Sequence, residues 1–358
     1  MKEVVEGEIR LLIPEPVFYN PRMKLNRDIC CAVVRGLGGK VKIKFLDLLA
    51  GTGAKGLRVA KAAGCWVSLN DANPKAWEVI LKNAELNGLK VEAYNRKANL
   101  LLQEIEGLNF IDIDPFGTPI PFLDNAVMAL KRGGYLGVTA TDTAPLCGVH
   151  PKACLRKYGA VTLRTAFCHE VGMRILIGYM ARTCAKYTKG ARCLLSHYNE
   201  HYFRAYIHVS NGKKEADKAL SEMGYLYYCK TCLNREYIKD FPQKRMCRCG
   251  ERFGVSGPLW LGKLCDRGFL EKVFVEAWGL VDNPGLKTIR LLRGELEEPF
   301  YYDLHELCMA WKIEVPPTNK VLQVLRNLGF KASRTHYSPI GIKTNATVET
   351  FKKILMKN

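Results

Sequence analysis

Short apolar runs alternate with amphipathic segments in the first half of the chain. The runs have the length of strands, and the segments between them repeat apolar residues at helical spacing. Such alternation predicts a mostly parallel sheet with helices on both faces. The expected strands are 42–50, 66–70, 91–94, 110–114 and 135–141, and the expected helices are 54–63, 74–87 and 121–131.

The second half of the chain has a different pattern. Residues 191–198 and 202–210 flank the short turn "NEH" and predict an antiparallel hairpin that ends the sheet. Helical spacing is expected from Thr162 onward and again over 213–224, where Gly224 is the expected end of the helix. The remainder predicts a helix at 266–280 and a small α+β unit with helices at 303–312, 317–328 and 347–356 and strands near 330–336 and 340–344.

Length and composition narrow the class of protein. A chain of 358 residues suits about two domains, and 48% hydrophobic with 25% charged residues is typical of a soluble globular protein. No run of about eighteen uncharged apolar residues is present, which argues against a membrane span. The start, "MKEVVEGEIR", mixes both charges without an apolar core and does not have the pattern of a signal peptide.

Charge adds a functional indication. The chain has 54 Lys and Arg against 35 Asp and Glu, a net charge of +19. Such an excess favours a polyanionic partner, because neutralising phosphates releases their condensed counterions. We therefore expect a nucleic acid, the alternative being a merely basic soluble protein. Residues 330–343 combine cations with an aromatic, as an RNA-docking hairpin would, although ordinary surface chemistry gives a similar composition.

The first expected strand leads into a glycine-rich loop. Gly51, Gly53 and Gly56 form GxGxxG, and Asp71 ends the next strand, which is also the pattern of a dinucleotide-binding domain. Three features favour S-adenosylmethionine. Asp47 precedes the glycines, so its carboxylate can meet the methionine ammonium. A dinucleotide needs its pyrophosphate at a helix N-terminus, whereas adenosylmethionine needs only close backbone approach. The final hairpin is typical of methyltransferases.

Other parts of the cofactor site follow from position. Asp71 is expected to accept hydrogen bonds from the ribose hydroxyls, a role compatible with capping the next helix. The backbone of Ala98, after the third strand, is expected to border the adenine. Segment 17–30 is expected to fold over the cofactor, with Arg27 pairing the methionine carboxylate; the alternative is a basic loop that touches phosphate.

The fourth strand ends in "DIDPFGTP". An exocyclic amine is a poor nucleophile, so an enzyme must align it and accept its N–H bonds as positive charge develops. Asp114 supplies such an acceptor, and Phe116 offers an apolar face on which a flipped base can stack. Asp112 is interpreted as a supporting carboxylate. The alternative is an Asp-Pro turn with a phenylalanine in the core.

The cysteines divide into two groups. Ten of the fourteen are scattered through apolar or helical segments, where a free thiol behaves as a small hydrophobe. The other four form CxxC and CxC pairs separated by fourteen residues, which predicts a structural zinc site with no open coordination position; chance clustering and an iron–sulfur cluster are the alternatives. This usage suits a reducing cytoplasm. The predicted zinc ligands are Cys229, Cys232, Cys247 and Cys249.

Over nearly its full length the chain resembles the tRNA (guanine-N2)-dimethyltransferase family acting at position 26 of tRNA, whose members are class I adenosylmethionine-dependent methyltransferases. The resemblance implies a Rossmann-like α/β domain at 1–254, which includes a zinc knuckle at about 225–254, and an α+β tRNA-binding domain at 255–358. The motifs that carry it are 18–28, 46–58, 70–76, 112–124, 156–170 and the cysteine cluster.

This resemblance implies transfer of one or two methyl groups to the guanine amino group, with Arg27, Asp71 and Ala98 at the cofactor and Asp114 as the catalytic acid or base. Lys55 stands where the family tends to have Arg, which leaves a cation for the cofactor carboxylate but loses the bidentate fork. Lys97 replaces an expected acid near the adenine. The alternatives are an amine methyltransferase acting on DNA or protein and a non-catalytic zinc-containing RNA-binding protein. We expect a monomer, although no residue pattern addresses the oligomeric state.

Overall fold

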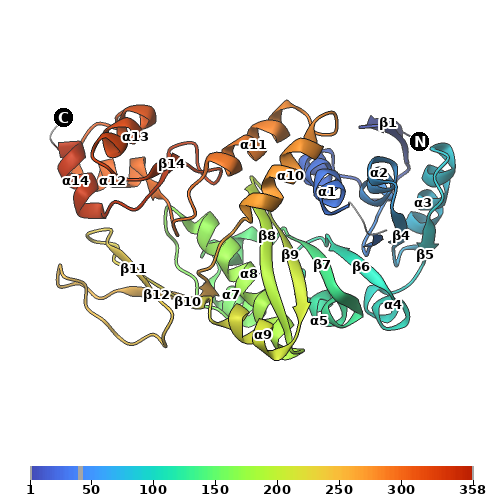
Figure 1. Cartoon of the computed structure of the whole chain (residues 1–358), viewed down its shortest axis with the longest axis horizontal. Coiled ribbons are helices and arrows are strands. Elements are labelled where there is room, and N and C mark those ends of the chain that lie inside the picture. Colours follow the sequence, from blue (N-terminus) through green and yellow to red (C-terminus); the bar gives the residue numbers. More distant parts are fainter. Residues whose placement is uncertain (1, 39–42, 357–358) are drawn as a thin grey trace.

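A seven-stranded mixed sheet forms the centre of the molecule (Figure 1). The computed structural model describes residues 2–38 and 43–356, so Lys42, the first residue of the strand expected at 42–50, lies outside the described residues. The strand order is β5-β4-β3-β6-β7-β9-β8; the first five strands are parallel, and β9 runs antiparallel to both of its neighbours. The strands are β3 Lys44–Asp47, β4 Trp66–Asn70, β5 Glu92–Tyr94, β6 Leu108–Ile113, β7 Leu130–Ala140, β8 Lys189–Asn199 and β9 Tyr202–Asn211.

Both faces of this sheet are covered by helices because successive strand residues point to opposite faces. Phe45 and Phe110 pack in the core shared with α1, α2 and α10, whereas Leu46 and Ile111 pack in the core shared with α4, α5 and α8. The expected fold class is thereby confirmed, including the antiparallel hairpin. The helices are α1 Lys24–Leu37, α2 Ala54–Ala63, α3 Pro74–Leu86, α4 Ala98–Glu104, α5 Ile120–Ala129, α6 Thr143–Leu146, α7 Pro151–Tyr158, α8 Cys168–Lys186, α9 Lys213–Leu220, α10 Arg267–Ala277 and α11 Asn283–Gly294.

The strand order reverses between β3 and β6. These two strands lie side by side, and Asp47 at the end of β3 pairs in register with Asp112 in β6. In open α/β sheets, ligands bind outside the carboxyl ends of the strands at such a switch point. The topology therefore places the ligand site where Asp47 and the residues after β6 meet.

An N-terminal hairpin precedes the sheet, formed by β1 (Lys2–Glu6) and β2 (Ile9–Ile13). A short 3₁₀ turn over Pro21–Met23 leads into α1. The hairpin and α1 were not expected from the sequence, which predicted only a covering segment at 17–30. In the structure α1 packs against α2 and α10, so that segment is partly a core helix.

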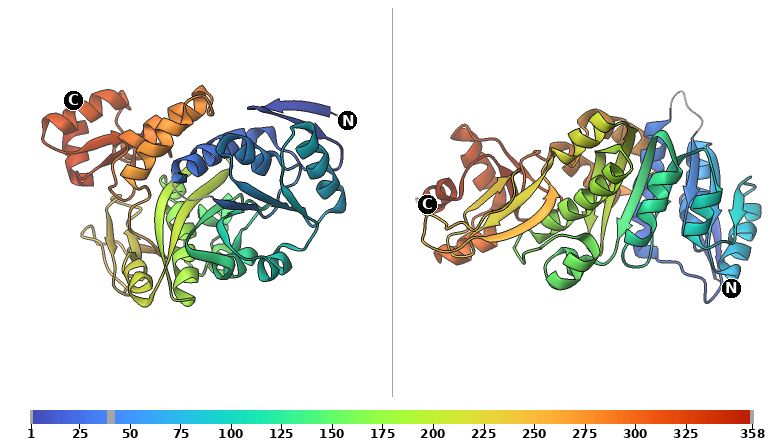
Figure 2. Two further views of the ribbon diagram at one scale, coloured as in Figure 1. Left: turned by 45° about the vertical axis from the view of Figure 1, so that its right-hand side comes forward. Right: turned by 90° about the horizontal axis from the view of Figure 1, so that it is seen from below.

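Two smaller sheets lie beyond the central one, toward the other end of the molecule (Figure 2). The first sheet carries the cysteine cluster, and the second forms the C-terminal α+β unit with three helices. None of the helices in the described ranges is long and apolar enough to cross a membrane. The elements are β10 Met223–Tyr228, β11 Arg235–Ile238, β12 Gly254–Trp260, β13 Tyr302–Asp303, β14 Ala332–Arg334, β15 Gly341–Thr344, α12 Leu304–Trp311, α13 Thr318–Asn327 and α14 Val348–Met356.

Two predicted helix boundaries were wrong. Helix α9 ends at Leu220 instead of Gly224, and Gly224 lies in β10, where a Cβ atom would approach the Ile238 carbonyl to 2.3 Å. This glycine thus permits close strand contact and does not stop a helix. Helix α8 begins at Cys168 instead of Thr162, because Val161 exchanges backbone hydrogen bonds with Gly257 and holds the preceding segment extended.

Part of segment 330–343, for which an RNA-docking role was expected, is buried. Lys343 is buried and forms ion pairs with Glu170 (3.3 Å) and Glu295 (3.1 Å). His336 pairs with the same Glu295, and Tyr337 is buried. The Lys343–Glu170 pair joins the C-terminal unit to α8. These three side chains are not available to an RNA, whereas Lys331 of the same segment is exposed.

Candidate active site

A cavity of about 960 Å³ opens at the carboxyl ends of the central strands. Its wall is formed by the segment before α1, the glycine loop after β3, the end of β4 and the corner after β6. Gly53 and Ala98, which were predicted to bind the cofactor, are not part of this wall. Seven other predicted residues line it together: Arg27, Asp47, Gly51, Lys55, Asp71, Asp114 and Phe116.

The glycine loop holds a backbone conformation that side chains rarely adopt. Gly51 has φ +55°, and a Cβ atom there would come within 3.0 Å of the Phe18 carbonyl. Gly53 has φ +81° and precedes the first turn of α2. The Asp71 carboxylate accepts a hydrogen bond from the Gly51 N–H at 2.9 Å. This loop therefore presents bare backbone to the cavity, as a closely approaching ligand requires.

Asp47 is buried at the end of β3 and accepts a hydrogen bond from the Gly56 N–H at 3.0 Å. Burial raises its pKa to about 7; the nearby Asp112 and Asp114 act in the same direction, and Lys55 opposes them. A carboxyl group with this pKa gives up its proton readily when a cation binds beside it. Asp47 at the switch point is thus a carboxyl group that a neighbouring cation would readily ionise.

Asp112 and Lys55 form a buried ion-pair network with Arg204. The Lys55 Nζ atom contacts Asp112 Oδ1 at 2.7 Å, and Arg204 of β9 pairs with Asp112 Oδ2. Burial opposes ionisation of Asp112, but Arg204 and Lys55 outweigh it and keep its pKa below the usual value. Asp112 is therefore a charged residue of the network. The sequence suggested a supporting carboxylate, and the groups that Asp112 contacts are Lys55 and Arg204.

Asp114 follows β6 and lines the cavity. Its Oδ2 atom receives contacts from the Lys55 ammonium (2.5 Å) and the Asn26 amide (3.3 Å). No donor contacts Oδ1 in residues 2–38 or 43–356, so this oxygen has no hydrogen-bond partner within the described part of the protein. Lys55 was predicted to serve the cofactor carboxylate, but the structure directs it to the two aspartates.

Phe116 has a side chain that is 94% exposed. Its ring meets Phe18 edge to face, with centroids 6.4 Å apart. Gly117 fixes the corner, because its N–H donates to Thr141 Oγ1 at 2.7 Å and its carbonyl accepts from the Thr141 N–H at 2.9 Å. A large apolar ring held in the open beside a cavity offers a stacking surface. The alternative of a core phenylalanine is excluded.

Arg27 is held by a second buried network. Its Nε and Nη2 atoms donate to Glu6 at 2.6 and 2.5 Å, and Nη2 also donates to the Asn20 carbonyl at 3.1 Å. Arg58 contacts the same Glu6 at 2.8 Å. Burial opposes ionisation of Glu6, but the bonds from Arg27, Tyr19 and Arg58 lower its pKa to about 2. The side chain of Arg27 is thus fixed at the cavity wall, with Nη1 outside the Glu6 pair.

Asp71 does not cap α3: the N-cap is Asn73, whose side chain accepts from the Lys75 N–H at 3.0 Å. Asp71 Oδ1 accepts from the Asn73 N–H at 2.9 Å and so holds the turn before the helix. Ala98 is the first residue of α4 and is buried. Sequence reasoning missed Glu6 and Asn26 and gave Arg204 no role. Only Arg204 had a usable signal: an arginine inside an apolar strand pattern indicates a buried charge that needs a partner.

The four clustered cysteines converge, with their Sγ atoms within 4.8 Å of one another. Cys229 Sγ lies 3.5 Å from Cys249 Sγ, and Cys232 Sγ lies 3.4 Å from Cys247 Sγ. Thiolates around a tetrahedral zinc, each about 2.3 Å from the metal, would lie roughly 3.8 Å apart. The geometry fits a four-thiolate metal site.

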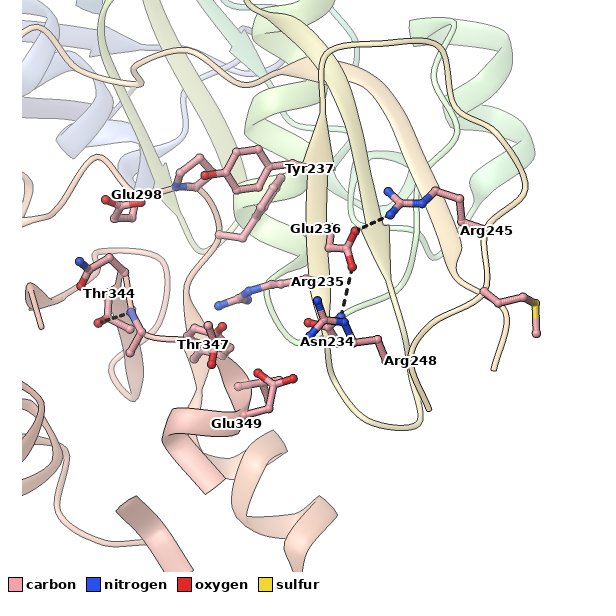
Figure 3. A pocket seen from close by; sticks show the side chains of 17 residues that line it. Asn234, Arg235, Glu236, Tyr237, Arg245, Arg248, Glu298, Thr344, Thr347 and Glu349 are labelled. Carbon is pink, nitrogen blue, oxygen red and sulfur yellow. Dashed lines mark hydrogen bonds and ion pairs between the residues drawn. The ribbon is translucent and has the colours of Figure 1, made fainter. Parts of the chain in front are cut away.

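A second cavity, of about 540 Å³, lies between β11 and the C-terminal unit (Figure 3). Arg235 points toward that unit, and its Nη1 donates to the Tyr301 carbonyl at 2.6 Å. Arg245 pairs with Glu236 at 3.1 Å, and Arg248 is exposed at the mouth. This cavity contains both signs of charge, so its arginines are partly neutralised.

A family model described as "N2,N2-dimethylguanosine tRNA methyltransferase" matches residues 2–356. The chain belongs to this family. Among curated members, the tRNA (guanine(26)-N(2))-dimethyltransferase of Pyrococcus furiosus is 41% identical over 99% of the chain and 98% of its own length. That of Methanothermobacter thermautotrophicus is 38% identical, with the same coverage of both chains.

One solved structure matches the whole fold of this tRNA methyltransferase family member. The complex of Trm1 from Pyrococcus horikoshii with S-adenosyl-L-methionine superimposes with a TM-score of 0.92 at 40% identity and covers 99% of both chains. The family, the Rossmann-like fold and the methyltransferase class expected from the sequence are therefore confirmed.

Proposed function

We propose that this family member transfers one or two methyl groups from S-adenosylmethionine to the exocyclic N2 of guanine 26 in tRNA. The observation that supports this most directly is the corner after β6, which holds an accessible carboxylate and an exposed ring at the cavity that contains the glycine loop. Its curated relatives carry the name of this activity.

The cavity fits adenosylmethionine in three places. Asp47 would bind the methionine ammonium, which is consistent with a carboxyl group whose pKa lies near 7. Arg27 would hold the methionine carboxylate through Nη1, since Glu6 occupies Nε and Nη2. Asp71 would accept hydrogen bonds from the ribose hydroxyls, beside the backbone of Gly51. Ala98 lies outside the cavity wall, so its predicted contact with the adenine stays a proposal.

The residues around Asp114 perform the rest of the chemistry. When bound, adenosylmethionine supplies the methyl group as an electrophile. Asp114 Oδ1 accepts an N–H of the guanine amine and takes its proton as positive charge develops on nitrogen. Lys55 and Asn26 hold the other oxygen and orient the carboxylate. Phe116 stacks on the flipped base and holds the amine in line with the methyl group.

For the tRNA partner, we propose that the C-terminal part of the chain, expected to begin at residue 255, binds tRNA outside the active site. Its helix α10 packs against α1 in the core of the central sheet, so the part that stands apart from this core is the C-terminal α+β unit. The net charge of +19 supports a polyanionic substrate. Arg248 beside the second cavity is a phosphate-contact candidate, since it is exposed and on the same loop as the cysteine cluster (Figure 3).

We further propose that the cysteine cluster binds a structural zinc ion. All four converging groups are thiolate ligands, so no coordination position is left for water or substrate. An ion there would hold β10 to the loop before β12 in a region with few buried apolar residues. Chelation should loosen this sheet and weaken tRNA binding, while adenosylmethionine binding in the central cavity is retained.

Substrate class is tested by incubating the protein with methyl-labelled adenosylmethionine and tRNA, DNA or ribosomal protein, followed by nucleoside mass spectrometry. We expect label in N2-methylated guanosine of tRNA. Label found only in DNA or protein would replace the tRNA assignment with one of the other amine substrates. No adenosylmethionine binding by calorimetry would favour a non-catalytic RNA-binding protein.

The Asp114→Ala variant tests the mechanism. We expect at least about a hundredfold lower transfer, with adenosylmethionine and tRNA affinities retained. A suitable control is Asp124→Ala, because Asp124 is a partly exposed carboxylate of α5 that pairs with Lys186 outside the cavity. Unchanged turnover in Asp114→Ala would remove Asp114 from the mechanism.

A further inference from the structure

A second group of metal-ligating side chains lies apart from the four-cysteine site. Cys147, Cys168 and His169 place one donor atom each within 4.8 Å of the others. Cys147 directly follows α6, and the other two residues form the first turn of α8. Cys147 is buried and the other two are half-buried, so the group is sheltered but within reach of solvent. The proposed methyl transfer assigns no role to any of them.

The imidazole of His169 is positioned as a metal ligand would be. Its Nδ1 atom is buried and has no hydrogen-bond partner among the described residues, although an unpaired buried polar atom is costly. The ring stacks on Tyr198, with centroids 4.1 Å apart, which holds the imidazole in one orientation.

Two thiols alone would suggest a disulfide. A disulfide between Cys147 and Cys168 would, however, use only two of the three clustered donor atoms, whereas a metal ion would bind one donor from each of the three residues. Two thiolates and one imidazole form a ligand set that favours zinc over harder divalent ions such as magnesium and calcium. We propose that Cys147, Cys168 and His169 bind a second zinc ion, with one coordination position left for water or another small ligand.

Such an ion would tie two segments together near the central cavity. Cys147 ends the segment that starts with Thr141 and Asp142, both in the cavity wall, while α8 packs beneath the sheet. Zinc at this position would fix that part of the wall to the beginning of α8. Its role is therefore to position the wall of the cavity.

Zinc content of the purified full-length protein tests the proposal. We expect two equivalents of zinc per chain by elemental mass spectrometry, and one equivalent in Cys147→Ser and in His169→Ala. His169→Cys should keep two, because a thiolate can replace the imidazole. Cys65→Ser is a matched control, since Cys65 is another half-buried cysteine outside both clusters, and should also keep two.

Two results would overturn the proposal. One is an unchanged zinc content in Cys147→Ser and His169→Ala, with circular dichroism showing that both fold. The other is a wild-type mass that lacks two hydrogen atoms, with a Cys147–Cys168 cross-link in peptide mapping. Loss of zinc in Cys229→Ser, with one equivalent retained, would separate the two sites and support the proposal.

Discussion

Three aspartates lie within one small region, and their neighbours give each a different state. Burial raises the pKa of Asp47 to about 7, while Arg204 and Lys55 overcome burial at Asp112 and keep its pKa low. Asp114 is partly exposed and has one oxygen held by Lys55 and Asn26. Chemically identical side chains are thus suited to binding a cation, supporting a network and accepting a proton.

Adenosylmethionine affinity should rise as the pH increases through about 7. Only ionised Asp47 can pair with the methionine ammonium, and its carboxyl group is largely protonated below that pH. The charged groups that face it are Lys55, Asp112 and Asp114. Calorimetric titrations from about pH 6 to 7.5 measure the effect.

The Asp47→Asn variant is the control for this pH dependence. It should bind more weakly at neutral pH and show a flat profile, because the amide cannot titrate. A profile in the variant that still rises with pH would assign the titration to another group.

Phe116→Ala should weaken tRNA substrate use without a change in stability. The ring is 94% exposed, so its removal leaves no cavity. A lost base stack costs about 1–3 kcal/mol, so kcat/KM should fall by about 5- to 150-fold. Trp66→Ala, which removes a ring that is 61% exposed at the start of β4 and outside the cavity wall, should leave kcat/KM unchanged. Equal kinetics for the two variants would contradict base stacking.

For single residues, the sequence was most informative where the position of a side chain depends only on the end of the strand that carries it. The positions of Asp47, Asp71 and Asp114 follow from parallel strands whose carboxyl ends meet at one edge. The partners of Arg27 and Lys55 could not be predicted in the same way, because Glu6 and Arg204 come from elements far away in the chain. Long-range ion pairs leave no periodic signal.

Among the elements, the N-terminal hairpin has an effect beyond its size. Its last β1 residue, Glu6, is buried and receives hydrogen bonds from Arg27, Arg58 and Tyr19. The hairpin thereby fixes α1 and α2 at the cavity. This arrangement was not evident from the sequence, since "KEVVEGEIRLLI" has no complete strand alternation and the partners of Glu6 come from other elements.

Glu6→Gln should destabilise the fold by about 3–5 kcal/mol, because breaking a buried ion pair leaves an uncompensated charge. Asp28 still pairs with Arg58, which favours the lower end of this range. Since the pKa of Glu6 falls from 4.5 to about 2 on folding, wild-type stability should decrease as the pH drops from about 4.5 toward 2. Urea unfolding at several pH values measures both effects.

Glu3→Gln is a matched control in the same hairpin. Glu3 pairs with Arg10, but both side chains are about half exposed. Solvent screens such pairs, so we expect no measurable loss of stability. A loss equal to that of Glu6→Gln would mean that the hairpin, and not the buried pair, determines the effect.

Element type was predictable wherever local periodicity and burial agreed. Helix α2 and strand β4 match their predicted bounds, since each has a clear pattern and ends at a glycine or at the next turn. The helix predicted over 213–224 is present as α9 but ends four residues early, because Gly224 lies in β10 in close contact with β11. Tertiary contacts override local patterns at such positions.

For the whole molecule, charge and shape act together. The central sheet and the C-terminal unit lie along one long axis (Figure 1), and the net charge is +19. An elongated basic protein can contact a large nucleic acid at points well separated from the active site. Composition predicted the charge, but the distribution of basic side chains between buried pairs and the surface required the structure, as Lys343 and Arg204 demonstrate.

tRNA affinity should fall steeply with salt, and Arg248→Ala should reduce the slope of log affinity against log salt by about 1. The reason is that a variant with one phosphate contact fewer releases fewer counterions from the tRNA when it binds. Lys82→Ala on α3, at the opposite end of the molecule, is the control and should leave the slope unchanged. Filter binding over a range of salt concentrations gives both slopes, and equal slopes would place Arg248 outside the interface.

The one-sided contacts of Asp114 have a consequence for successive transfers. Because only Oδ1 is open, a single hydrogen of the amine can point to the carboxylate at a time. After the first transfer, the remaining hydrogen lies on the other side of the nitrogen. If Asp114 takes the proton as proposed, the monomethylated base has to rotate about its C2–N2 bond before the second proton can leave. We therefore expect the singly modified nucleoside to accumulate as a transient intermediate.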